Sequence, residues 1–84
     1  MNTTELSRIH WACRRGMLEL DQLLEAFFLS SYSLLSEQEK QDFIDLLASA
    51  DQDLFNWLLG DSEPEHERFK KLCEKIRDQY THTH

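Results

Sequence analysis

Apolar residues recur at intervals of three and four along almost the whole chain, and no stretch alternates apolar and polar residues as a half-buried strand would. Only two glycines and one proline interrupt the 84 residues, so turns are few and helices are favoured. The spacing predicts an all-α fold, a compact bundle of about five short helices. A chain of this length suits a single domain, and we expect flexible tails at residues 1–3 and 81–84.

Capping residues and glycines predict the helix ends. The first helix is expected to begin at residues 2–4 and to run to about Arg15, where Gly16 closes it in a left-handed conformation. Ser36 and Glu39 have the spacing of a capping box, which predicts the start of the third helix. The second helix, between these two points, has the widest apolar stripe and should be the main core helix: Met17, Leu20, Leu23, Leu24, Phe27 and Phe28.

The second half of the chain predicts two more helices. A fourth is expected to begin at Ser49 with Gln52, or at Asp51 alone, and to end at Gly60. The core side chains expected on the third and fourth helices are Phe43, Leu46, Leu47, Ala50, Leu54, Phe55 and Leu58.

The fifth helix is expected to follow a second capping box. Ser62 and Glu65 have the required spacing, and Pro64 between them would lie in the first turn, where its missing N–H is harmless. The apolar residues that follow at helical spacing are Phe69, Leu72, Cys73, Ile76 and Tyr80.

Two cysteines lie within apolar stripes. Cys13 and Cys73 are therefore expected to be small core hydrophobes, in a reducing compartment. The first residues do not show a basic n-region followed by an apolar h-region, so we expect no signal peptide. The longest apolar stretch, LLEAFFL, is far shorter than the ~20 residues that span a bilayer. We expect a soluble, cytoplasmic protein that is monomeric and does not insert into membranes.

The net charge of −7 argues against nucleic acid as a partner, because phosphate binding requires a basic surface. The acidic residues are concentrated in the middle of the chain: residues 17–66 carry twelve of them against one lysine, whereas both ends are mildly basic. Either the ends fold back against the acidic middle or one of them faces a partner.

Side chains that could support catalysis or metal binding are sparse. His10 and Cys13 have a ligand spacing for one helix face, but no further ligands accompany them, and His82 and His84 lie in a short polar tail. The same pair is the only conceivable nucleophile and base, and both residues are better explained by packing. We therefore expect no catalytic residue, no metal and no cofactor on this chain, and no enzyme.

The region around Gly16 is different, because packing explains it poorly. Trp11 falls on the side of the first helix opposite Leu6, Ile9 and Cys13, with arginines one turn before and after it. Tryptophan and arginine are the residue types enriched in the hot spots of protein interfaces. Gly16 would allow close approach, and Glu19 could pair with an arginine of this chain or of a partner. The candidate partner-binding residues are Arg8, Trp11, Arg14, Arg15, Gly16, Glu19 and Asp21.

At these residues the sequence resembles a known family. The stretch IHWACRRGMLELD, with an RGxxE element at Arg15, Gly16 and Glu19, resembles the signature of the SdhE family of succinate dehydrogenase assembly factors, also called flavinators. The later stretch FIDLLASADQDLFNWLLG is similar to a second block of that family. The flanking residues that match the first block are Arg8, His10, Trp11, Arg14 and Asp21.

The resemblance implies an assembly factor that binds the flavoprotein subunit of succinate dehydrogenase, and in some bacteria that of fumarate reductase. Such a factor promotes covalent attachment of FAD to a histidine of that client protein, and the RGxxE residues lie in its client-binding surface. Two alternatives stay open: an antitoxin that partners a small membrane toxin, as relatives have also been described, and a generic protein-interaction module.

Overall fold

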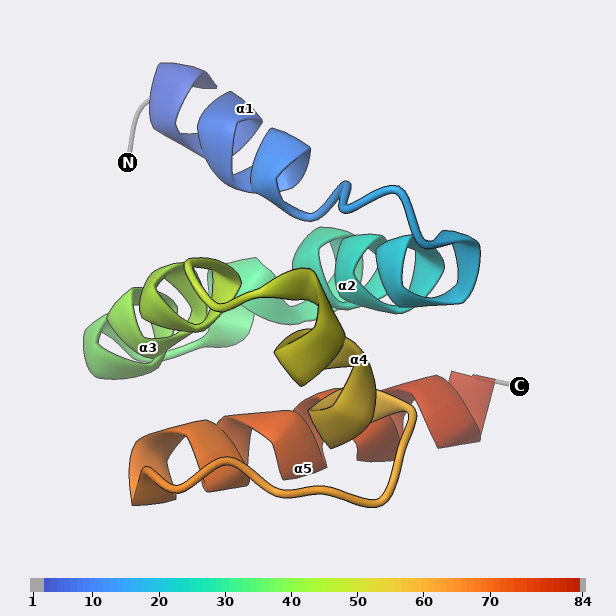
Figure 1. Cartoon of the computed structure of the whole chain (residues 1–84). Helices are drawn as coiled ribbons and strands as arrows, with labels where there is room; N and C mark the ends of the chain where they lie inside the picture. Colours follow the sequence, from blue (N-terminus) through green and yellow to red (C-terminus); the bar gives the residue numbers. More distant parts are fainter. Residues whose placement is uncertain (1–2, 84) are drawn as a thin grey trace.

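The computed structural model describes residues 3–83, and their side chains as far as Tyr80. All the regular secondary structure of these residues is helical, so the predicted all-α class and the five α-helices are confirmed (Figure 1). In chain order they are α1 (Thr3–Ala12), α2 (Leu18–Ser31), the short 3-10 helix η1 (Tyr32–Leu34), α3 (Glu37–Leu47), α4 (Asp51–Leu58) and α5 (Glu67–Thr83).

The core lies between α2, α3 and α5. In Figure 1, α2 and α3 lie between α1 on one side and the long α5 on the other, and α4 packs against both α2 and α5. α2 is the main core helix, as predicted: Leu20, Leu23 and Leu24 are almost completely buried, and Phe27 contacts Phe43 of α3. The buried side chains that α5 contributes are Phe69, Leu72, Cys73 and Ile76.

Charged side chains join α3 to α5. Arg68 donates to Asp42 and Asp45 at 3.1 and 2.8 Å, and Lys75 pairs with Glu39. These contacts set the basic carboxyl-terminal helix against acidic residues from the middle of the chain. The basic residues of α5 are therefore partly neutralised within the protein.

The predicted capping box at the start of α3 is confirmed. The Ser36 hydroxyl accepts from the Glu39 amide, and the Glu39 carboxylate accepts from the Ser36 amide, both at 3.1 Å. Each side chain satisfies a backbone donor that the first helical turn leaves without a partner. The hydrogen bond from Lys75 and, to a smaller extent, the one from the Ser36 amide lower the pKa of the Glu39 carboxyl.

The first helix ends earlier than expected. α1 stops at Ala12, and the amides of Cys13 and Arg14 donate to carbonyls three residues back, which tightens the last turn. Gly16 does have the predicted left-handed conformation, with φ of +85°, but it lies inside the connection to α2. Ile9 and Cys13 are buried as predicted, whereas Leu6 is 37% exposed.

Helix α4 begins without the side-chain cap that the sequence suggested. Its N-cap is Ala50, which is exposed and has no side-chain acceptor, so placing Ala50 in the core was wrong. Asp51 is the first residue of the helix, and its carboxylate binds an arginine instead of capping the backbone. Leu54 and Leu58 are buried as predicted, and Phe55 is half-buried.

The second capping box does not form. The Ser62 amide donates to the Asn56 carbonyl at 3.2 Å, so Ser62 belongs to the turn after α4, five residues before the first residue of α5. α5 starts at Glu67, and Glu65 and the buried Pro64 lie in the connection before it.

Part of the expected tails, residues 1–2 and 84, lies outside the described residues, while Thr3 belongs to α1 and α5 extends to Thr83. Among the described helices, none is both long enough and apolar enough to cross a bilayer.

Candidate functional site

The exposed tryptophan of α1 defines the candidate site. Trp11 is 70% exposed, and the Arg14 guanidinium lies 5.3 Å from the centre of its ring, a cation–π contact. Arg8, one turn earlier on the same side of the helix, is also exposed. The outward placement predicted for Trp11 is therefore confirmed, and two cationic side chains accompany it.

Helix α2 extends this surface. Arg14 lines one hollow with His10 and Trp11, and it lines a second hollow with Leu18 and Gln22 of α2. Leu18 is 74% exposed although it is apolar. We call the exposed residues of this region the α1–α2 surface: Arg8, Trp11, Arg14, Gly16, Leu18, Glu19 and Gln22.

Glu25 joins the two helices beneath this surface. Its carboxylate lies 2.8 Å from His10 Nε2 and 3.9 Å from the Arg14 guanidinium. The His10 ring also stacks on Phe28, with 5.3 Å between the ring centres. These contacts fix α1 on α2 and leave the outer face of Arg14 accessible beside Trp11.

Arg15 does not lie beside Trp11 as the helical pattern suggested. Its side chain is only 16% exposed and turns into the protein, where Nε donates to the Asp51 carboxylate at 2.7 Å. Its two terminal nitrogens donate to the carbonyls of Ala12, Leu47 and Ser49 at 2.8–2.9 Å. Because α1 ends at Ala12, the helical phase that would have placed Arg15 on the outer face does not reach it.

Asp21 holds the backbone of the same connection. Its carboxylate oxygens accept from the amides of Arg15 and Gly16, at 2.7 and 3.2 Å. Asp21 is half-buried, so its part in the candidate surface is to fix the connection between α1 and α2.

The other two residues of the RGxxE element face outward. A Cβ at Gly16 would meet no heavy atom within 4 Å, so the space beside this glycine is open. Glu19 is exposed in the first turn of α2, and no arginine of the described residues pairs with it. The acidic partner of Arg15 is Asp51 and not Glu19.

His10 and Cys13, the pair considered for metal or thiol chemistry, have structural contacts instead, and the side chains of His82 and His84 lie outside the described residues. Cys13 is completely buried, its thiol donates to the Ile9 carbonyl at 3.4 Å, and burial raises its pKa to about 12. Cys73 is buried too, and burial raises its pKa to about 11. Since a thiolate is both the nucleophile and the metal ligand, neither cysteine is suited to either task. No group of three potential ligands gathers among the described residues.

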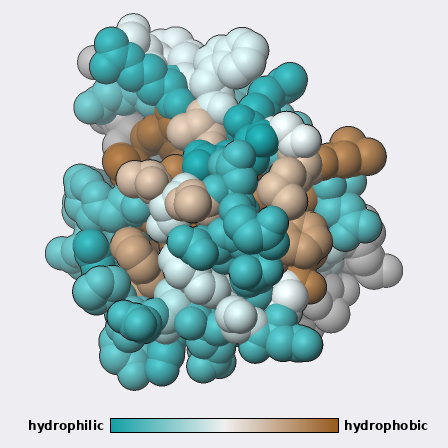
Figure 2. All heavy atoms as spheres, in the orientation of Figure 1, coloured by the Kyte–Doolittle hydropathy of each residue, from teal (hydrophilic) through white to brown (hydrophobic). Residues whose placement is uncertain are grey.

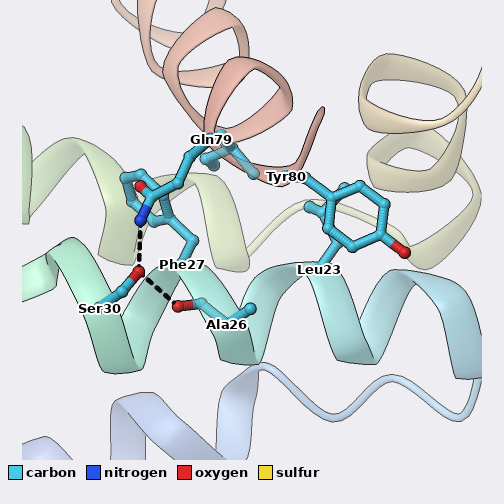
Figure 3. Close-up of a pocket in the computed structure, with 7 residues that line it drawn as sticks. Leu23, Ala26, Phe27, Ser30, Gln79 and Tyr80 are labelled. Carbon is cyan, nitrogen blue, oxygen red and sulfur yellow. Dashed lines mark hydrogen bonds between the residues drawn. The ribbon is translucent and has the colours of Figure 1, made fainter. Parts of the chain in front are cut away.

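A third hollow lies between α2 and α5, but its lining residues offer little chemistry. Figure 3 shows Leu23, Phe27 and Tyr80 around it, with Ser30 and Gln79 at one edge. The Gln79 amide donates to the Ser30 hydroxyl, which donates to the Ala26 carbonyl, so these polar groups satisfy one another. No acidic or basic side chain lines this hollow.

Figure 2 shows hydrophobic residues in separate patches between hydrophilic ones on the face that it presents.

The sequence did not predict Leu18 and Gln22 as part of the α1–α2 surface, and it did not predict Asp51 as the partner of Arg15. Leu18 could have been found, because it is an apolar residue outside the core stripe of α2.

Comparisons with known proteins agree in pointing to one family. A family model described as "Flavinator of succinate dehydrogenase" matches residues 7–80. The FAD assembly factor SdhE of Photorhabdus laumondii is 47% identical over 93% of this chain and 89% of its own length. The protein of the same name from Vibrio vulnificus is 47% identical over 88% and 86%. A solution structure of a UPF0350 protein, 42% identical, superposes with a TM-score of 0.79 over 99% of this chain and 89% of that one.

Proposed function

Because this chain belongs to the family of flavinators of succinate dehydrogenase, we propose that it binds the flavoprotein subunit of that enzyme and promotes its covalent flavinylation. The FAD is attached to the client, and this chain binds no cofactor of its own. The flavoprotein of fumarate reductase is a second client of the same kind. On this proposal the factor acts in the cytoplasm, as a monomer.

The observation that carries the proposal is the exposed Trp11 with Arg14 against its ring. Leaving a tryptophan 70% exposed forgoes the free energy that its burial would contribute to folding, and a partner that covers it recovers that contribution. The surrounding Arg8, Leu18 and Glu19 offer a cation, an apolar side chain and an anion for matched groups of the client.

The mechanism proposed is selection of a client conformation. Covalent flavinylation requires the isoalloxazine ring and the client histidine in reactive geometry, and such orientation can lower a barrier by up to about 7–11 kcal/mol in the best intramolecular cases. A factor that binds the reactive conformation more tightly than other conformations raises its population. The chain needs no catalytic group for this role, which suits a surface built from Trp11, Arg14 and their neighbours.

The test is flavin loading in a strain that lacks the gene, measured as covalent flavin fluorescence of the succinate dehydrogenase flavoprotein subunit after denaturing electrophoresis. We expect loading to fall in the deletion strain and to return with the wild-type gene. Unchanged loading in the deletion strain would refute the proposed function.

A variant pair tests the surface. Trp11→Ala should weaken client binding by about 2 kcal/mol or more, roughly thirtyfold, as for an interface hot spot. Its free energy of unfolding should change by no more than about 0.5 kcal/mol, because the side chain is exposed. Leu34→Ala is the matched control: Leu34 is 82% exposed in η1, outside the α1–α2 surface, and its removal should leave client affinity unchanged. Equal affinity of the two variants would argue against a role for Trp11.

A further inference from the structure

We propose that Arg15 and Asp51 are positioning residues, which hold the connection between α1 and α2 in the arrangement that the client recognises without themselves touching the client. This inference rests on the proposed function. It assigns the arginine of the RGxxE element a role inside the protein, and it adds Asp51, a residue of α4, to the set on which client binding depends.

The contacts of Arg15 carry the inference. Its guanidinium donates four hydrogen bonds, to Ala12, Leu47, Ser49 and Asp51. Ala12 and Leu47 are the last residues of α1 and α3, where carbonyls lack partners within the helix. One side chain therefore satisfies the ends of two helices and binds the first residue of a third.

These acceptors leave the guanidinium little capacity for a client. Arginine has five N–H donors, and four bonds are made within the chain. The side chain is only 16% exposed, compared with 61% for Arg14. Arg14 is thus available to a client, whereas Arg15 is occupied by the fold.

The backbone of Arg15 is held as firmly as its side chain. Asp21 binds the amides of Arg15 and Gly16 from the side of α2, while the guanidinium anchors the same residue to the corner between α3 and α4. Gly16, with its left-handed φ, lies directly after this doubly held residue. Its open flank is therefore presented in one defined orientation.

Loosening the connection between α1 and α2 should weaken client binding by lowering the fraction of molecules in the competent arrangement. If the connection adopts the competent arrangement only part of the time, the apparent dissociation constant rises in inverse proportion to that fraction. The effect would arise without the loss of any atom that touches the client.

The experiment compares Asp51→Asn with Asp53→Asn in the whole protein. Both aspartates are exposed and lie in the first turn of α4, so both substitutions remove a similar favourable interaction with the helix dipole. Only Asp51 binds Arg15. Amide hydrogen exchange at Arg15 and Gly16 is measured by NMR on the free protein, and affinity is measured against the purified flavoprotein subunit.

We expect Asp51→Asn to speed exchange at both amides and to weaken client affinity by up to about fivefold, the upper limit set by the full free energy of a partly exposed ion pair. Asp53→Asn should change neither quantity. Arg15→Gln should weaken affinity about tenfold or more, because several hydrogen bonds are lost together. Adding Asp51→Asn to Arg15→Gln should then cause little further loss, since the pair acts as a unit.

Two results would overturn the inference. One is a loss of affinity in Arg15→Gln with no change in Asp51→Asn, as direct contact of Arg15 with the client would give. The other is additive losses in the double variant. If the wild-type protein does not bind the flavoprotein at all, the proposed function fails, while the exchange measurements still test the positioning of the connection.

Discussion

Substitutions at Gly16 distinguish two reasons why a glycine can be required: its left-handed backbone conformation and the close approach of a client. Its φ is +85°, where an L-residue costs about 1–2 kcal/mol because its Cβ crowds the backbone. The space around it is open, since a Cβ would meet no heavy atom within 4 Å. Gly16→Ala and Gly16→Arg should therefore reduce the free energy of unfolding by the same amount, about 1–2 kcal/mol. Gly16→Asn should cost less, because asparagine tolerates this conformation.

Thermal unfolding followed by circular dichroism measures the common backbone cost. For a domain of 60–100 residues, each kcal/mol lowers Tm by about 4–8 °C. All three variants should remain folded at 25 °C with native helix content. An arginine variant much less stable than the alanine variant would refute the conclusion that the site is open.

Client affinity then tests whether Gly16 is also required because a larger side chain would block close approach of the client. On the proposed function, Gly16→Ala retains most of the affinity, whereas Gly16→Arg loses binding and flavin loading because its long side chain blocks close approach. Gly16→Asn is the control for an intermediate side chain with little backbone cost. Equal client binding by the arginine and alanine variants would refute steric exclusion, and unchanged flavin loading by Gly16→Arg would refute the mechanism as a whole.

Two further predictions concern groups with shifted pKa values. Burial raises the pKa of Cys13 to about 12 and that of Cys73 to about 11. Neither thiol should therefore react with Ellman's reagent at pH 8 until the protein unfolds. Stoichiometric reaction of the native protein would contradict this prediction. The pKa of Glu39 is lowered from its ordinary 4.5 chiefly by Lys75, so its contribution to stability is present above about pH 4.5 and is lost as the pH falls through the lowered value. The urea midpoint should therefore fall between pH 5 and 3, and less steeply in Glu39→Gln; identical slopes in both proteins would count against this ion pair.

Features of the fold that depend on neighbours in the sequence could be predicted. The capping box at Ser36 and Glu39 involves residues three apart, and the structure reproduces both of its hydrogen bonds. The second candidate box failed, although its spacing is the same. The Ser62 amide donates to the Asn56 carbonyl in the turn that follows α4, and α5 begins only at Glu67, five residues later; the spacing of Ser62 and Glu65 alone does not distinguish these two outcomes.

The sequence predicted the exposed position of Trp11 in the candidate site, but it did not predict the contact between Arg15 and Asp51 beneath it. Trp11 broke the apolar pattern of α1, and this alone indicated an outward position. The inward position of Arg15 could not be predicted, because two of its acceptors are backbone carbonyls more than 30 residues away. Every residue has a backbone carbonyl, so the sequence does not indicate which of them will accept. Asp51 looked like a helix cap for the same reason: its partner is distant along the chain.

The span of the Arg15 contacts also bears on the order of folding. Its bonds to Leu47, Ser49 and Asp51 close loops of 32, 34 and 36 residues, whereas each helix needs only bonds between near neighbours. Local helices form before such distant contacts, so the connection that carries Gly16 should reach its final geometry late. A chain still missing its α3–α4 corner, whether nascent or cleaved, would have its tryptophan exposed and yet lack an ordered connection beside it. Recognition by the client would then be reserved for molecules that have finished folding.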